Sequence, residues 1–133
     1  MRKTQSINES LTTQRDSLVI IPMYNEKENA ANIIEAVLGQ PHAFDVLVID
    51  DNSPDGTAAI VKQKMEEHPG RVRLIERSGK LGLGTAYIAG FKWGLGHHYD
   101  YIFEMDADFS HNPDDLPALY RECAENGSDV AIG

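Results

Sequence analysis

Short apolar runs alternate with stretches of helical periodicity along most of the chain. The apolar runs cover 17–22, 44–49, 72–75 and 99–105, and a further run begins at 130–132. They are rich in β-branched residues and end in turn formers, which is typical of strands buried in a parallel sheet. Between them, apolar positions recur at helical spacing over 26–38, 57–67, about 84–95 and 112–126. This alternation predicts an α/β fold, with a mostly parallel sheet and helices on both faces.

The loops with the most chemical content fall at one edge of the expected sheet. In a doubly wound sheet, ligands bind beyond the carboxyl ends of the strands. The loops at that edge are 22–26, 50–57, 76–84 and 106–111. Asn25, in the first of them, is the expected N-cap of the helix that follows. The sequence therefore predicts a ligand site assembled from these loops.

Two aspartates one residue apart, Asp106 and Asp108, follow the expected strand 99–105. Side chains at i and i+2 of a strand point to the same side, so we expect the two carboxylates to converge. Mg2+ and Mn2+ favour oxygen ligands, and the pair therefore predicts a site for one of these ions. The alternative is that Asp108 caps the next helix and that Asp106 is merely solvated.

Other residues of these loops suit a nucleotide. Tyr24 offers a ring that can stack on a base, and the carboxylates of Glu26 and Asp51 can accept hydrogen bonds from ribose or base. The alternatives are a packed aromatic, a first-turn helix residue and a turn former, respectively. His111 is a metal ligand in one interpretation and a bystander in the other.

The loop at 76–84 is basic and rich in glycine, which suggests a phosphate cradle. It is not a P-loop, because Lys80 precedes Gly82 and Gly84, and no G-x-G-x-x-G follows the first strand. The alternative for Gly82 and Gly84 is close packing of the following helix. Both interpretations stay open at this point.

Composition narrows the class of protein. A chain of 133 residues suggests one domain, and its net charge of -9 argues against nucleic-acid binding through a broad basic surface. Cys123 is the single cysteine, so an intrachain disulfide is excluded, and packing is its expected role. No apolar run approaches the roughly 20 residues needed to span a bilayer.

The two ends of the chain carry separate expectations. Residues 1–16 are polar and lack the apolar core of a signal peptide, so we expect a flexible leader. The chain stops within the pattern of a strand at 129–133, and we expect residues 17–133 to be part of a longer domain, truncated at its C-terminus.

Four segments together carry a resemblance to a known family: 22–26 (PMYNE), 48–57 (VIDDNSPDGT), 80–87 (KLGLGTAY) and 105–111 (MDADFSH). They resemble family 2 glycosyltransferases of the GT-A fold, and most closely the polyprenol-phosphate (dolichol-phosphate) mannosyltransferases. The resemblance covers residues 17–133. It implies a Rossmann-like GT-A domain that binds a nucleotide-sugar.

The resemblance also implies residue roles. The positions that hold the guanine and ribose of the donor match Pro22, Tyr24, Glu26, Ile49 and Asp51. The segment that contacts the donor diphosphate and the metal matches Asp106, Ala107 and Asp108. In this segment Asp106 and Asp108 are the implied catalytic, metal-binding pair, with Asp108 the most direct ligand. Ser110 falls at a polar position close to donor or metal.

The implied activity is transfer of a hexose, with inversion, from a nucleotide-sugar to a polyprenyl monophosphate. GDP-mannose is the favoured donor, Mg2+ or Mn2+ the cofactor, and the cytoplasmic face of a membrane the implied place of action. The acceptor phosphate is already an anion, so no general base is required. The alternatives are a UDP-glucose-dependent or hydroxyl-acceptor relative, and a donor-binding module without activity. A receiver domain phosphorylated on an aspartate would need a lysine after a late strand, and the pattern places none there.

Overall fold

The computed structural model describes residues 15–79, 82–126 and 130–132. Its strands are β1 (Ser17–Met23), β2 (Phe44–Asp50), β3 (Val72–Glu76), β4 (Tyr101–Glu104) and β5 (Val130–Ile132). Its helices are α2 (Lys27–Leu38), α3 (Thr57–Glu67), α4 (Leu83–Gly96), the 3-10 turn η1 (Pro113–Asp115) and α5 (Leu116–Asn126). All pairings between these strands are parallel, in the order β3-β2-β1-β4-β5. The predicted α/β architecture is confirmed.

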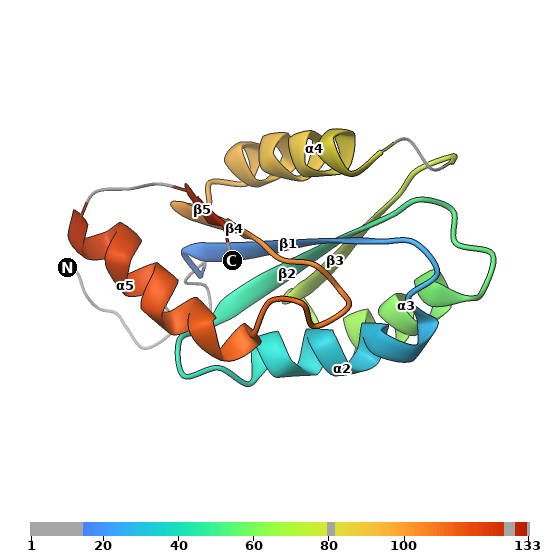
Figure 1. Ribbon diagram of the computed structural model, residues 1–133, viewed down its shortest axis with the longest axis horizontal. Coiled ribbons are helices and arrows are strands. Elements are labelled where there is room, and N and C mark those ends of the chain that lie inside the picture. The colour runs from blue at the N-terminus through green and yellow to red at the C-terminus, as the bar shows by residue number, and fades with distance from the viewer. Residues whose placement is uncertain (1–14, 80–81, 127–129, 133) are drawn as a thin grey trace.

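The sheet separates two apolar cores, because alternate residues of each strand face opposite sides. Val19 and Ile21 of β1 belong to the core shared with α2, α3 and α5. Leu18 and Ile20 belong to a smaller core shared with α4. Figure 1 shows α4 on one side of the sheet and α2, α3 and α5 on the other. All four of these β1 side chains are completely buried.

Helix α4 packs unusually close to the sheet, through two glycines one turn apart. A Cβ on Gly90 would lie 2.7 Å from Cγ2 of Ile20. One on Gly94 would lie 2.9 Å from side-chain carbons of Leu18 and Ile102. The absence of side chains at Gly90 and Gly94 therefore fixes the height of α4 above β1 and β4.

The central strands separate at their carboxyl ends. β4 pairs with β1 only from Ser17 to Ile20, whereas β1 continues to Met23 beside β2. A hydrogen bond of 3.0 Å from the N–H of Met105 to the carbonyl of Ile20 is the last link between them. Pro22 is the next residue of β1 whose backbone nitrogen faces β4. Because β4 no longer pairs with β1 at this point, the missing N–H of proline costs no hydrogen bond between strands. A gap opens there, at the point where the strand order reverses.

Two local predictions differ from the structure. The strand expected over 99–105 spans only Tyr101–Glu104, and Met105, whose N–H makes the last bond to β1, is buried as expected. Asn25 is not the N-cap of α2; it adopts a positive φ of 55°, and Glu26 occupies the cap position. The amides at this helix start are instead satisfied by a distant segment. The N–H of Glu26 donates to Thr57 (3.0 Å) and that of Lys27 to Asp55 (3.1 Å).

The remaining expectations concern the chain's ends and Cys123. Residues 1–14 of the expected leader lie outside the described residues, while Arg15 pairs with Asp45 and Asp16 accepts a hydrogen bond from Ser17 (2.8 Å). Cys123 is 1% exposed within α5, consistent with packing. Among the described residues, no helix combines the length and apolar character required to cross a membrane.

Candidate functional site

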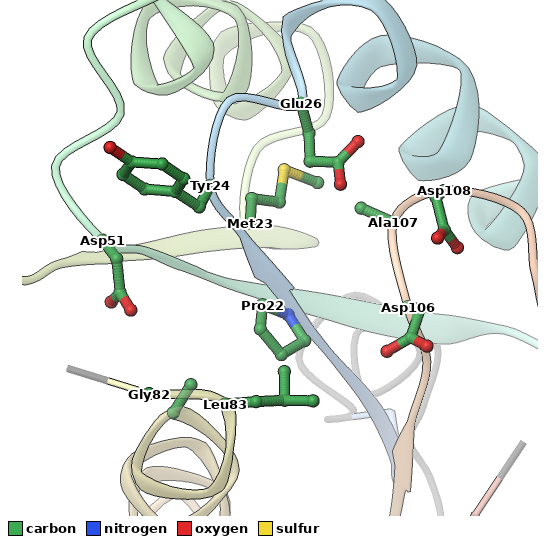
Figure 2. Close-up of a pocket in the computed structure, with 11 residues that line it drawn as sticks. Pro22, Met23, Tyr24, Glu26, Asp51, Gly82, Leu83, Asp106, Ala107 and Asp108 are labelled. Carbon is green, nitrogen blue, oxygen red and sulfur yellow. The ribbon is translucent and has the colours of Figure 1, made fainter. Parts of the chain in front are cut away.

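A cavity of about 290 Å³ lies at the carboxyl edge of the sheet, where β1 and β4 separate. It is lined by Pro22, Met23, Tyr24, Glu26, Asp51, Gly82, Leu83, Ala86, Asp106, Ala107 and Asp108. Figure 2 shows Tyr24 and Asp51 on one side of the cavity and Asp106 and Asp108 on the other, with β1 between them. The sequence placed its candidates at this edge, and the structure brings most of them around one cavity.

The acidic residues of segment 50–57 have two different roles: some stabilise the loop, and one lines the cavity. Asp50 accepts hydrogen bonds from the backbone and the hydroxyl of Ser53 (3.1 and 2.6 Å), which closes a turn. Asp55 accepts from the hydroxyl of Thr57 (2.5 Å), and this bond is the main reason that the pKa of Asp55 is lowered. Both carboxylates hold the loop in shape. Asp51 is the acidic residue of this segment that lines the cavity.

Asp51 is fixed by an arginine that the sequence analysis did not single out. Nε and Nη2 of Arg77 donate to the two oxygens of Asp51 at 2.6 and 2.9 Å. The same guanidinium reaches Oγ1 of Thr85 (3.0 Å) and the carbonyl of Gly82 (3.3 Å). Arg77 therefore ties the ends of β2 and β3 to the start of α4. A planar fork of donors can hold all of these acceptors at once.

Asp106 and Asp108 lie beyond β4, in a turn. Oδ1 of Asp106 accepts from the hydroxyl of Tyr87 (3.1 Å), and Oδ2 from the hydroxyl of Ser110 (3.2 Å). Asp108 accepts from the N–H of Ser110 (2.9 Å), which lowers its pKa and keeps it ionised. Phe109, between Asp108 and Ser110, has a positive φ of 64°. The turn, rather than strand alternation, brings both carboxylates to the cavity.

No lysine or arginine among the described residues compensates the charge at this pair of aspartates. Within the described part of the chain, neither Asp106 nor Asp108 forms an ion pair with lysine or arginine. Hydroxyls of Tyr87 and Ser110 and the amide of Ser110 donate to them, and such neutral donors orient a carboxylate without neutralising it. Two carboxylates held beside one cavity in this way suit a hard divalent cation. One or two protein carboxylates suffice when substrate phosphates complete the shell of Mg2+.

Tyr24 and Glu26 both line the cavity, and each also has a local role. Tyr24 is 37% exposed, so its ring presents a substantial surface at the rim. Glu26 is the N-cap residue of α2, and its Oε1 accepts from Asn29 at 3.2 Å. The first-turn role weighed for Glu26 therefore coexists with its place at the cavity.

Two predicted residues are not part of the cavity wall. Ile49 is completely buried in the core beneath α4, so its side chain supports the site from below. Ser110 is exposed and reaches the cavity through its bonds to Asp106 and Asp108. His111 contributes Nδ1 as an acceptor to the N–H of Asp106 at 3.4 Å, which is a supporting contact.

The glycine-rich loop also contributes to the cavity. Its glycines do not serve the close helix packing that was the alternative for Gly82 and Gly84. A Cβ on Gly84 would meet open space, and Gly82 has a positive φ of 104° and lines the cavity. The glycines that permit close packing are Gly90 and Gly94 instead. Lys80 lies outside the described residues. Met23, Leu83 and Ala86 complete the cavity wall. In the sequence, only their position beside the candidate motifs could have predicted this.

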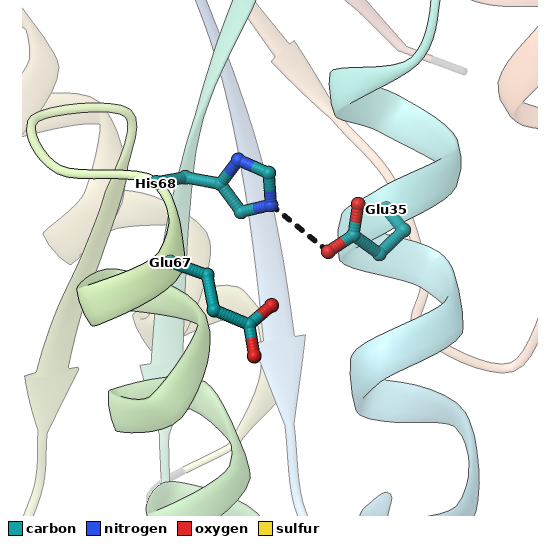
Figure 3. Close-up of side chains that lie close together, drawn as sticks. All are labelled: Glu35, Glu67 and His68. Atoms are coloured by element: carbon teal, nitrogen blue, oxygen red, sulfur yellow. Dashed lines mark hydrogen bonds and ion pairs between the residues drawn. The ribbon is translucent and has the colours of Figure 1, made fainter.

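A second cluster of ligand-type side chains lies away from the cavity, between α2 and α3. Figure 3 shows Glu35, Glu67 and His68 close together, with His68 and Glu35 joined at 2.9 Å. The ammonium of Lys64 donates to Glu35 (2.7 Å) and Glu67 (2.9 Å). It already supplies the positive charge that a metal would bring. The cluster therefore links two helices.

Comparison with protein families gives a match over most of the chain. A family model described as "Glycosyl transferase family 2" matches residues 18–133. The chain is 47% identical over 121 residues to polyprenol monophosphomannose synthase of Mycolicibacterium smegmatis, covering 91% of this chain and 45% of that protein. It is 39% identical over 117 residues to dolichol-phosphate mannosyltransferase of Pyrococcus furiosus, covering 86% and 32%. The chain thus spans less than half the length of these curated relatives.

Solved structures agree on the architecture. A mannosyltransferase from Pyrobaculum calidifontis, in complex with GDP-Man and Mn2+, aligns with a TM-score of 0.62 at 27% identity, covering 73% of this chain and 28% of that one. TarS of S. aureus, in complex with UDP-GlcNAc, aligns with a TM-score of 0.68 at 20% identity, covering 84% and 32%. The second likeness shows the fold alone.

Proposed function

The chain belongs to glycosyl transferase family 2, and we propose that it forms the donor-binding part of a polyprenol-phosphate mannosyltransferase. The proposed reaction moves mannose from GDP-mannose to a polyprenyl monophosphate, with inversion at the anomeric carbon. The names of the curated relatives support the acceptor, and the Pyrobaculum complex supports the donor. The proposed place of action is the cytoplasmic face of a membrane, where a water-soluble donor meets a lipid acceptor.

The observation that carries the proposal is the division of the cavity into two ends. At one end lie the ring of Tyr24 and the carboxylate of Asp51, which suit a nucleoside. At the other lie Asp106 and Asp108, whose charge no described lysine or arginine offsets. A nucleoside diphosphate bound as a cation complex presents these same two chemistries along one molecule. The cavity is matched to that order.

In this proposal the residues of the chain bind and orient the donor. Tyr24 stacks on the base, and Asp51, held by Arg77, accepts hydrogen bonds from base or ribose. Pro22 and Met23 form the floor between the two ends, and the backbone of Ala107 lies beside the diphosphate. Ile49 supports this floor from the core. Ser110 keeps the carboxylates of Asp106 and Asp108 turned toward the cavity.

Asp106 and Asp108 would hold Mg2+ or Mn2+, and their oxygen atoms and uncompensated charge fit such an ion. When bound, the cation offsets negative charge that develops on the departing diphosphate. The two aspartates would hold the cation in a fixed position beside the diphosphate. The acceptor phosphate is itself anionic at neutral pH, so the chain needs no general base for the attack.

A transfer assay tests this function. The protein is incubated with Mn2+, radiolabelled GDP-mannose or UDP-glucose, and either a short polyprenyl phosphate or the matching polyprenol. We expect label in the phosphate acceptor with GDP-mannose and none in the alcohol, because the alcohol lacks the anionic nucleophile. NMR of the product should show an inverted anomeric centre. Preference for UDP-glucose or for the alcohol would overturn the proposal, as would failure of the protein to bind GDP.

A further inference from the structure

Tyr87 is a tyrosine of α4 whose hydroxyl reaches across to the site. It donates to Oδ1 of Asp106 at 3.1 Å, nineteen positions along the chain. Its ring packs against the core beneath α4, and its neighbour Ala86 is 2% exposed at the cavity wall. Gly90, less than one turn on, sets the distance from α4 to the sheet. The place of the Tyr87 hydroxyl is therefore fixed by packing.

The bond leaves the charge of Asp106 in place. A phenol is a neutral donor at neutral pH, because its ordinary pKa is about 10. The other oxygen of Asp106 accepts from the hydroxyl of Ser110. Each oxygen thus has one neutral donor and retains a lone pair for another partner. The arrangement orients a carboxylate without neutralising it.

A second tyrosine–aspartate pair shows the opposite arrangement. The hydroxyl of Tyr99 donates to Asp45 at 2.6 Å at the amino end of the sheet. Asp45 is also paired with Arg15, and the guanidinium of Arg71 lies 3.7 Å away. There two guanidinium groups already offset the charge of Asp45, so a cation has nothing left to offset. Asp106, by contrast, has no arginine or lysine partner among the described residues.

We propose that Tyr87 is a positioning residue that holds the carboxylate of Asp106 in the orientation needed to bind a divalent cation together with a nucleoside diphosphate. The inference rests on the proposed function, because it takes Asp106 as a cation ligand. Groups that orient a metal-binding carboxylate typically change metal affinity by about 10–100-fold when removed. Tyr87 acts from the helix that also forms the cavity wall. A shift of α4 would therefore move both the wall and the ligand.

The test is calorimetric titration of GDP, with and without Mn2+, into the protein and its Tyr87→Phe variant. We expect Mn2+ to tighten GDP binding to the unaltered protein and expect this gain to fall about tenfold in Tyr87→Phe. The affinity for GDP without Mn2+ should stay the same. Tyr99→Phe is the matched control, since it removes a comparable hydroxyl from the opposite end of the sheet, and it should keep the full gain.

The contrary outcomes are distinct. An unchanged gain in Tyr87→Phe overturns the inference, as does an equal loss of affinity with and without Mn2+, which would show a structural role only. A double variant with Asp106→Asn gives an independent readout, because Tyr87→Phe should cost nothing further once Asp106 has lost its charge. Additive losses overturn the inference. If Mn2+ fails to tighten GDP binding to the unaltered protein, the proposed function fails with it.

Discussion

Asp45, at the amino end of the parallel sheet, and the pair Asp106 and Asp108, at its carboxyl end, have opposite surroundings. At the amino end, Asp45 is 2% exposed and is met by Arg15, Arg71 and Tyr99. At the carboxyl end, Asp106 and Asp108 are met by hydroxyls and an amide. Asp106 is half-buried and Asp108 is exposed, and no described lysine or arginine pairs with either, so both carboxylates are open to a cation. We therefore infer that Asp45 stabilises the fold, whereas Asp106 and Asp108 serve binding.

The largest effect on stability should come from Asp45→Asn at the amino end. The substitution leaves two arginines beside a neutral amide, and removing one partner of a buried ion pair costs roughly 3 kcal/mol. Urea denaturation should show this loss in the free energy of unfolding. Asp100→Asn, an exposed acidic residue at the same end, is the control and should change it by less than about 0.5 kcal/mol. Equal effects would remove the distinction between the two ends.

Gly90→Ala should have the next largest effect, because the new Cβ would overlap Ile20. Overpacking costs about 1–3 kcal/mol, which exceeds the roughly 1 kcal/mol that alanine gains over glycine in a helix. Gly84→Ala, in the same helix but facing open space, should gain stability instead. Thermal unfolding followed by circular dichroism compares the two. A stabilised Gly90→Ala would show that α4 is not held by this contact.

Arg77→Lys should have a smaller effect, and one that reaches the site. Lysine cannot present the fork that holds both oxygens of Asp51, so we expect a loss of about 1 kcal/mol in stability. Affinity for GDP should fall equally with and without Mn2+, because Asp51 lies at the nucleoside end. Arg121→Lys, at an exposed position of α5 outside the cavity wall, is the matched control. A loss confined to Mn2+-dependent binding would contradict this division of the cavity.

The smallest effect concerns the link between α2 and α3. Hydrogen bonds from Lys64 and His68 lower the pKa of Glu35 in the folded protein. A lowered folded-state pKa stabilises the protein above the unfolded value near 4.5, and this contribution disappears as the pH falls through the folded value. Glu35→Gln should therefore lose at most about 0.5 kcal/mol at pH 7, because the pair is exposed. It should lose nothing near pH 3.

The control for that change is Glu66→Gln, which alters an exposed charge on the same helix as Lys64. Its free energy of unfolding should match the unaltered protein at both pH values. If Glu35→Gln lost more stability at acidic than at neutral pH, the link would not act through an ionised Glu35.

The sequence predicted what depends on neighbours along the chain. Buried runs and helical periodicity located each strand and helix, and the positions of the loops predicted one edge for the site. Contacts between distant segments escaped prediction. Arg77 and Asp51 are 26 residues apart, and Thr57 satisfies the start of α2 from 31 residues away. No local pattern specifies such pairs. The local sequence therefore favoured Asn25 as the N-cap of α2, and this prediction was wrong.

The aspartate pair shows the same limit at the site. The sequence indicated Asp106 and Asp108, but strand alternation was the wrong reason, since β4 ends at Glu104 and a turn carries both residues to the cavity. Tyr87 was visible only as part of a motif. Its role follows from the close packing at Gly90 and Gly94, which the sequence analysis did not single out.

The most direct test of the account is the effect of Mn2+ on GDP affinity in Asp108→Asn. Asparagine keeps the size of the side chain and removes the charge that a cation requires. We predict that Mn2+ tightens GDP binding at least tenfold in the unaltered protein and in the exposed control Asp115→Asn. In Asp108→Asn the gain should vanish while the unfolding midpoint stays the same. A full Mn2+-dependent gain in Asp108→Asn would contradict the assignment of the carboxyl end as the binding site for the metal and the donor.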